Sequence, residues 1–151
     1  MSGRIRTQGF TLLELMLCLG VLGLLTGLTL GPSMSNRLQD TRLDGFVQGF
    51  TNDLRESRYS AVTNAQPYEV RVRLSGYYIY RQEGTLWKSL KYVAWPEGIS
   101  IDTSYNDQDV TITFSTTGIY DAWSNNTIHF KNSRGTRRNV IISSGGRIRV
   151  G

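Results

Sequence analysis

The chain has 151 residues, of which 17 are Lys or Arg and 12 are Asp or Glu, so its formal net charge is +5. This length suits one compact domain with an additional segment, and the single cysteine, Cys18, excludes an intrachain disulfide. The charge is unevenly placed, because no acidic residue follows Asp121. The cations of this basic C-terminal block are Lys131, Arg134, Arg137, Arg138, Arg147 and Arg149.

The N-terminal segment has the composition of a membrane anchor. Positions 1–9 contain arginines but no acid, and no charged residue lies from Leu15 to Asn36. A helix of about 22 residues is roughly 33 Å long, enough to cross the hydrocarbon core of a bilayer. Positive flanks stay in the cytoplasm. We therefore predict a transmembrane helix at residues 10–33, with the C-terminal part outside the cytoplasm.

A single carboxylate, Glu14, interrupts this apolar segment. A charged side chain within a membrane helix costs on the order of 2.5–3.5 kcal/mol at the bilayer centre and usually has a partner. Cleavage between Gly9 and Phe10 would create an α-amine in the same membrane layer, which Glu14 could neutralise within its own chain or on a neighbouring subunit. Gly9, Phe10 and Glu14 are thus predicted to act together; the alternative is an uncleaved anchor with an interfacial glutamate.

Beyond the anchor, the helical pattern continues on one side of the chain. Apolar residues recur at helical spacing among charged ones, which predicts an amphipathic helix over 34–64 with one buried face. That stripe consists of Leu43, Val47, Phe50, Leu54 and Ala61. Pro67 follows, so one helix should run from about residue 10 to about residue 64.

Residues 68–150 alternate between apolar and polar side chains and are divided by turn sequences. The predicted strands are 68–74, 77–81, 85–93, 99–101, 110–114, 126–131, 137–143 and 147–150. In the first of them Val70, Val72 and Leu74 should face the core, with Glu69 and Arg71 outside. The expected fold is α+β, with a long helix packed on an antiparallel sheet in a head that spans residues 34–151.

The N-terminal residues 4–14, RIRTQGFTLLE, resemble the class III signal of type IV pilins and pseudopilins. The resemblance implies that prepilin peptidase cleaves after Gly9 and removes leader 1–9, and that the new amine of Phe10 is methylated. It also implies that Glu14, at the fifth mature position, guides assembly with other pilin subunits. The chain would then be inserted in a bacterial inner membrane, processed there by these enzymes, and assembled into a filament.

The order of motifs in the head is similar to the GspH/FimT branch of the pseudopilins, and the likeness covers essentially the whole chain. The motifs are Trp95-Pro96-Glu97-Gly98, Ile112-Thr113-Phe114, Asn126-Thr127-Ile128, Asn139-Val140-Ile141-Ile142 and Gly146-Arg147-Ile148-Arg149. The resemblance implies a pilin-like fold and a minor subunit of a type IV pilus or of a type II secretion pseudopilus. Some pilus-associated members take part in natural transformation, and a C-terminal Gly-Arg-x-Arg motif is implicated in their DNA binding.

The C-terminal arginines leave three interpretations open. On a strand, Arg147 and Arg149 point to one side about 6.6 Å apart, and guanidinium groups suit phosphate oxygens. Arg134, Arg137, Arg138 and Lys131 could join this surface and bind DNA through its backbone, without sequence preference. The alternatives are a charged edge strand protected from aggregation, and pairing with the acidic surface of another pilin.

No catalytic set is recognisable, because the serines and threonines lack a base and an orienting acid. We expect no enzyme activity, no cofactor and no metal site, and we read His129 as a surface or packing residue. Arg71 should pair with a cross-strand acid such as Glu69 or Glu83. The predicted function is that of a GspH/FimT-type minor pilin that contacts DNA during uptake. The alternative is a structural minor pseudopilin of type II secretion with no DNA role.

Overall fold

The computed structural model describes residues 11–105, 109–120 and 126–151, without the side chains of residues 26–36. One helix, α1, runs over Leu12–Thr63. The chain divides into two compact units, residues 1–38 and 39–151, and the second contains every strand that the structure describes. The expected helix is therefore confirmed, and it begins and ends within a few residues of the predicted bounds.

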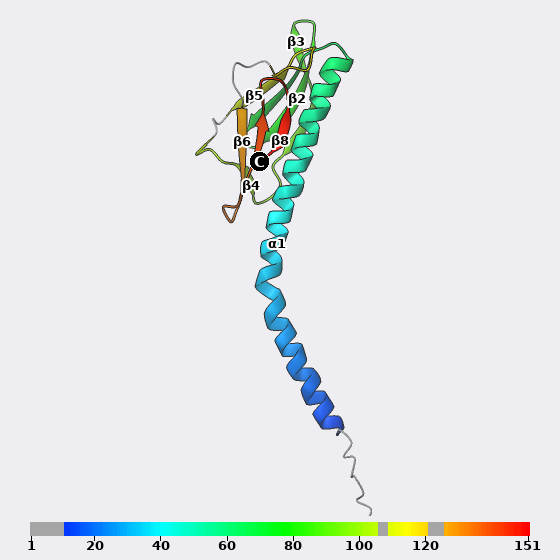
Figure 1. The fold of residues 1–151 in the computed structure, drawn as a ribbon, viewed down its shortest axis with the longest axis vertical. Helices are drawn as coiled ribbons and strands as arrows, with labels where there is room; N and C mark the ends of the chain where they lie inside the picture. The colour runs from blue at the N-terminus through cyan, green and yellow to red at the C-terminus, as the bar shows by residue number, and fades with distance from the viewer. Residues whose placement is uncertain (1–10, 106–108, 121–125) are drawn as a thin grey trace, which may run out of the picture. The chain divides into compact units, whose positions relative to one another are not determined.

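Eight strands follow the helix in the described part of the chain (Figure 1). They form two antiparallel four-stranded sheets with the orders β3-β2-β1-β5 and β4-β6-β7-β8. The strands are β1 Tyr68–Arg73, β2 Gly76–Glu83, β3 Leu86–Ala94, β4 Ile99–Ile101, β5 Val110–Phe114, β6 Asn126–Asn132, β7 Arg137–Ile142 and β8 Ile148–Val150. Each predicted strand is present, and the α+β pilin-like fold is confirmed.

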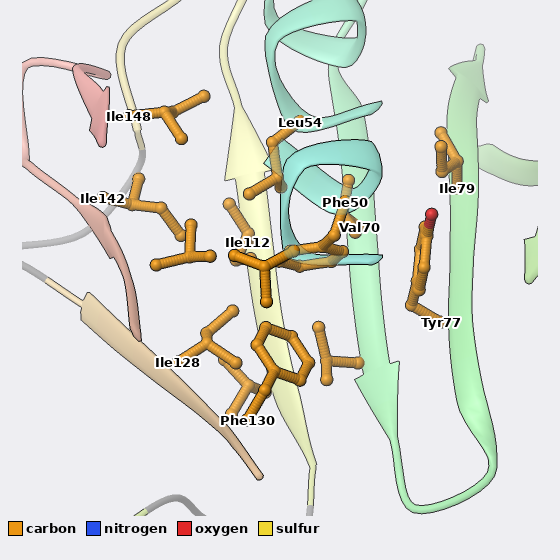
Figure 2. Close-up of a cluster of buried hydrophobic side chains, with 14 of the residues drawn as sticks. Phe50, Leu54, Val70, Tyr77, Ile79, Ile112, Ile128, Phe130, Ile142 and Ile148 are labelled. Atoms are coloured by element: carbon orange, nitrogen blue, oxygen red, sulfur yellow. The ribbon is translucent and has the colours of Figure 1, made fainter. Parts of the chain in front are cut away.

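The core lies between the second half of α1 and the inner faces of both sheets. Figure 2 shows Phe50 and Leu54 of α1 among Val70 and Ile112 of the first sheet and Phe130 of the second. The predicted stripe of the helix is buried throughout, from Leu43 to Ala61. Burial of this stripe, at roughly 1.5–3 kcal/mol for each large side chain, holds the helix on the sheets.

An aromatic cluster fills the centre of this core. The ring centroids of Phe50 and Phe130 are 5.2 Å apart, and those of Phe46 and Trp95 are 5.5 Å apart, with edge-to-face geometry. The Trp95 indole nitrogen donates to the Arg73 carbonyl oxygen at 3.1 Å, so the polar end of this ring is satisfied. Aromatic pairs of this kind define a single arrangement of helix and sheets.

Two expectations for β1 were wrong. Leu74 was assigned to the core face but lies past the end of the strand, in the turn to β2, with 54% of its surface exposed. Glu69 was assigned to the outside but is only 6% exposed, because the aromatic side chains of β2 and the stem of Arg71 cover it. Arg71 binds both carboxylate oxygens of Glu69 at 2.6 and 3.1 Å, along the same strand rather than across strands.

Candidate functional sites: the N-terminal helix and the C-terminal arginines

Glu14 occupies the first turn of α1. Its backbone NH is 3.3 Å from the Thr11 hydroxyl oxygen, the arrangement of a helix N-cap. Thr11 and Glu14 have the spacing of a capping box, so the local sequence defines this end of the helix. Gly9 and Phe10 lie outside the described residues.

The first part of α1 exposes apolar side chains on all sides. Leu12, Leu17 and Leu24 are 77%, 64% and 70% exposed, and positions 11–25 have no buried residue. A helix that is apolar all round requires lipid or other protein around it. Within the described residues, however, no helix combines the length and apolar character needed to cross a membrane. The predicted span includes residue 10 and the side chains of 26–33, which are not described.

Two hairpin arginines that we assigned to DNA binding form ion pairs with α1. Arg134 is 3.3 Å from Asp40, and Arg138 binds the Asp44 carboxylate at 2.6 Å. The Thr136 hydroxyl and the Asn132 amide also donate to Asp40, both at 2.9 Å. These hydrogen bonds, together with the nearby arginines, lower the pKa of the Asp40 carboxyl. The β6–β7 hairpin is thus attached to the helix by side chains 94 residues apart in the sequence.

Lys131 and Arg137 lie on the outer face of the second sheet and share one carboxylate, Asp102. The side chain of Asp102 is fully buried, with the Lys131 amine at 3.1 Å and Arg137 Nε at 2.8 Å. Burial by itself raises the pKa of the Asp102 carboxyl. The Lys131 amine and the Ser104 backbone NH outweigh that effect, and the pKa falls to about 2. These two cations therefore stabilise the loop after β4.

Arg147 and Arg149 differ from the other basic residues of the block. Both side chains are exposed, while Ile148 between them is 8% exposed and packs into the core. Neither arginine forms an ion pair with any residue that the structure describes. Since β8 pairs only with β7, it is an edge strand. Exposed and buried side chains alternate from Arg147 to Arg149, as predicted from the sequence, so both arginine side chains lie on the side away from the core.

Gly146 sets the position of this strand. It has φ +78°, and its NH donates to the Ser143 carbonyl oxygen at 2.8 Å. A Cβ at this position would overlap the carbonyl oxygen of Gly118 and lie 2.9 Å from Arg58 Nε. Position 146 therefore requires glycine for two reasons: its backbone is left-handed, and the loop that contains Gly118 approaches it closely. This packing explains the glycine that precedes the two arginines.

The carboxylates that neutralise most of the basic block were not predicted from the sequence. Asp40 and Asp44 are four residues apart and so share one face of a helix, which was a readable signal for two cationic partners. Asp102 had no such signal, because a lone acid after a short strand resembles ordinary loop chemistry. His129 contacts Asn139 at 2.8 Å and the Tyr105 ring at 5.0 Å, and the described residues contain no group of three metal-ligating side chains.

A long helix packed on antiparallel sheets, with an apolar N-terminal half, defines a pilin-like protein. Residues 47–146 match the family described as Type II transport protein GspH, and residues 4–30 match the prokaryotic N-terminal methylation motif. Because the first match covers most of the chain, this protein belongs to the GspH family. The family and the fold are those of structural pilins and pseudopilins rather than enzymes.

A solved structure shares this fold at low sequence identity. It is the minor pseudopilin EpsH from the type 2 secretion system of Vibrio cholerae, with a TM-score of 0.56 and 14% identity. The similarity covers 69% of this chain and 91% of that one, and it confirms the pilin-like architecture. No curated protein matches the sequence.

Proposed function

We propose that this protein is a minor type IV pilin whose head contacts DNA through Arg147 and Arg149 during DNA uptake. The observation that carries this proposal is the contrast within the basic block. Four of its cations form ion pairs with Asp40, Asp44 and Asp102, whereas Arg147, just before the edge strand β8, and Arg149, within it, form none with any described residue. Guanidinium groups placed in this way bind phosphate oxygens without reading the base sequence.

The salt dependence of DNA binding tests this proposal. Each phosphate contact on duplex DNA contributes about 0.9 to the slope of log affinity against log salt, so two arginines account for about 1.8. The full chain in nonionic detergent is titrated into a labelled duplex, and anisotropy is read at rising salt. We expect Arg147→Ala/Arg149→Ala to lower the slope by about 1.8. The matched control is Arg37→Ala/Arg42→Ala, which removes the same charge from exposed helix positions. No binding at low salt, or an equal loss in the control, contradicts the proposal.

Assembly through the N-terminal helix is the second part of the proposal. Prepilin peptidase removes residues 1–9, Phe10 is methylated, and Glu14 pairs with the new amine of its own or a neighbouring subunit. The match to the methylation motif and the exposed apolar surface of residues 12–25 support this route through the inner membrane. Intact-mass measurement of protein from native membranes tests it, since an unprocessed mass contradicts cleavage. Gly9→Val should stop processing.

A second candidate function is that of a structural minor pseudopilin in type II secretion. The family description, Type II transport protein GspH, and the fold shared with a pseudopilin favour it. In that case the head contacts other pseudopilins or exported protein, and Arg147 and Arg149 only protect the edge of β8. Deletion of the gene separates the two candidates: loss of transformation with normal export supports the pilus, and the reverse supports secretion.

A further inference from the structure

Arg58 of α1 reaches the turn that precedes the C-terminal arginines, a contact that was not predicted from the sequence. Its Nε donates to the Gly118 carbonyl oxygen at 2.8 Å, across 60 residues of sequence. A Cβ built on Gly146 would be 3.2 Å from the Arg58 guanidinium carbon. The guanidinium therefore lies directly against the turn whose next residue is Arg147.

Two loops hold this side chain in place. Gly118 and Gly146 have positive φ, +74° and +78°, and both lie close to Arg58. A Cβ on Gly146 would be 2.9 Å from Arg58 Nε, and a Cβ on Gly118 would be 3.4 Å from the same nitrogen and would collide with Val62. The stem of Arg58 passes Gly118, because a Cβ there would be 3.5 Å from Arg58 Cγ. An arginine fixed in this way has already lost much of the rotamer freedom that ligand binding would otherwise remove.

The hydrogen bond to Gly118 uses only one edge of the guanidinium. Within the described residues, Arg58 forms no ion pair, and its two terminal nitrogens make no hydrogen bond. Arg58 is half-buried, and neither terminal nitrogen is among the fully buried polar atoms that lack a hydrogen bond in the described residues, so both keep access to solvent. A guanidinium has five donors in a fixed fork, and the terminal pair suits two oxygens of one phosphate.

We propose that Arg58 is a third phosphate-binding residue beside Arg147 and Arg149, and that the site therefore joins helix α1 to strand β8. This inference rests on the proposed DNA contact and adds a residue to it. Arg147 and Arg149 are exposed side chains at the start of the edge strand β8, whereas Arg58 is held by the Gly118 carbonyl oxygen. Arg58 thus supplies the ordered member of the site, and the DNA backbone passes over the turn that begins β8.

The test compares variants of the full chain in nonionic detergent, with a labelled duplex as the probe. Arg58→Gln removes the charge and should lower the salt slope by about 0.9. Between about 50 and about 200 mM salt, the wild type should then lose about 3.5-fold more affinity than this variant. Arg58→Lys keeps the charge and should keep the slope. Arg42→Gln removes the same charge 16 positions earlier, about 24 Å along the helix, and should also keep it.

The outcomes separate this inference from the proposed function. If the wild type does not bind DNA at low salt, both fail. If it binds, and Arg147→Ala/Arg149→Ala weakens binding while Arg58→Gln leaves the slope unchanged, only the role of Arg58 is overturned. If Arg58→Lys lowers the slope as much as Arg58→Gln, the effect comes from the lost hydrogen bond to Gly118, and Arg58 is a structural residue. Urea unfolding of each variant shows whether the head remains folded.

Discussion

Gly146→Ala is the sharpest test of the packing at the start of β8. The substitution adds one methyl group at a residue with φ +78°, where it would meet the Gly118 carbonyl oxygen and the guanidinium of Arg58. A left-handed backbone costs a non-glycine residue about 1–2 kcal/mol. An extra methyl group in a packed site costs about 1–3 kcal/mol more. Together these terms predict a loss of about 2–5 kcal/mol in the free energy of unfolding.

Gly135→Ala separates the two terms. Gly135 has φ +83° in the β6–β7 turn, and nothing lies within 4 Å of a Cβ built there. It should therefore lose only the backbone contribution, about 1–2 kcal/mol. The difference between the two alanine variants measures the close approach of Gly146 to Gly118 and Arg58, and it should be about 1–3 kcal/mol.

The assay is urea unfolding of the full chain in detergent, followed by tryptophan fluorescence. Trp95 is half-buried against the core, so its emission should shift to the red when the head unfolds. The urea midpoint of Gly146→Ala should fall well below that of Gly135→Ala, with the same dependence on denaturant. Equal midpoints would mean that the loops of Gly118 and Gly146 are not packed as described, and the positioning of Arg58 would lose its basis.

Three further predictions concern the core, a buried carboxylate and the helix start. Phe130→Ala removes a fully buried ring from the aromatic cluster and should cost about 3–5 kcal/mol of unfolding free energy; a loss under about 1 kcal/mol would contradict the packing. Asp102→Asn should destabilise the head at pH 7, because Lys131 and Arg137 lose their shared anion. The pKa of Asp102 falls from 3.8 to about 2 on folding, so its contribution is present above about pH 4 and lost toward pH 2. The stability gap between the variant and the wild type should accordingly narrow over that range, and a constant gap would refute this assignment. Glu14→Leu should leave leader cleavage intact but stop incorporation into filaments, and normal amounts in sheared filaments would refute the pairing of Glu14 with the N-terminal amine.

The local elements were predictable because each rests on a short-range pattern. The buried stripe from Leu43 to Ala61 follows from helical periodicity, and the β6–β7 hairpin follows from two alternating segments around a polar turn. The helix start and the N-terminal motif were readable for the same reason. Glu69 shows the limit of this approach, since alternation placed it outside and only the neighbouring strand and Arg71 bury it.

The candidate site was predictable only in part. Arg147 and Arg149 could be identified from strand alternation, because a buried Ile148 turns its neighbours outward. Strand alternation could not predict the ion pair of Arg134 with Asp40, nor the hydrogen bond from Arg58 to the Gly118 carbonyl oxygen. Each joins residues 60 or more positions apart, and nothing local distinguishes a cation with such a partner from one without it.

The sequence alone determined that this protein has a long helix, an antiparallel head, a pilin-type N-terminal segment and a basic C-terminus. Those properties follow from periodicity, motif spacing and local composition, which can be recognised within short segments of the sequence. Tertiary structure decided which of the basic residues have anionic partners within the head and which have none among the described residues. The physical reason is that an ion pair depends on the distance between two charges in space, and that distance is set by how the helix packs on the two sheets.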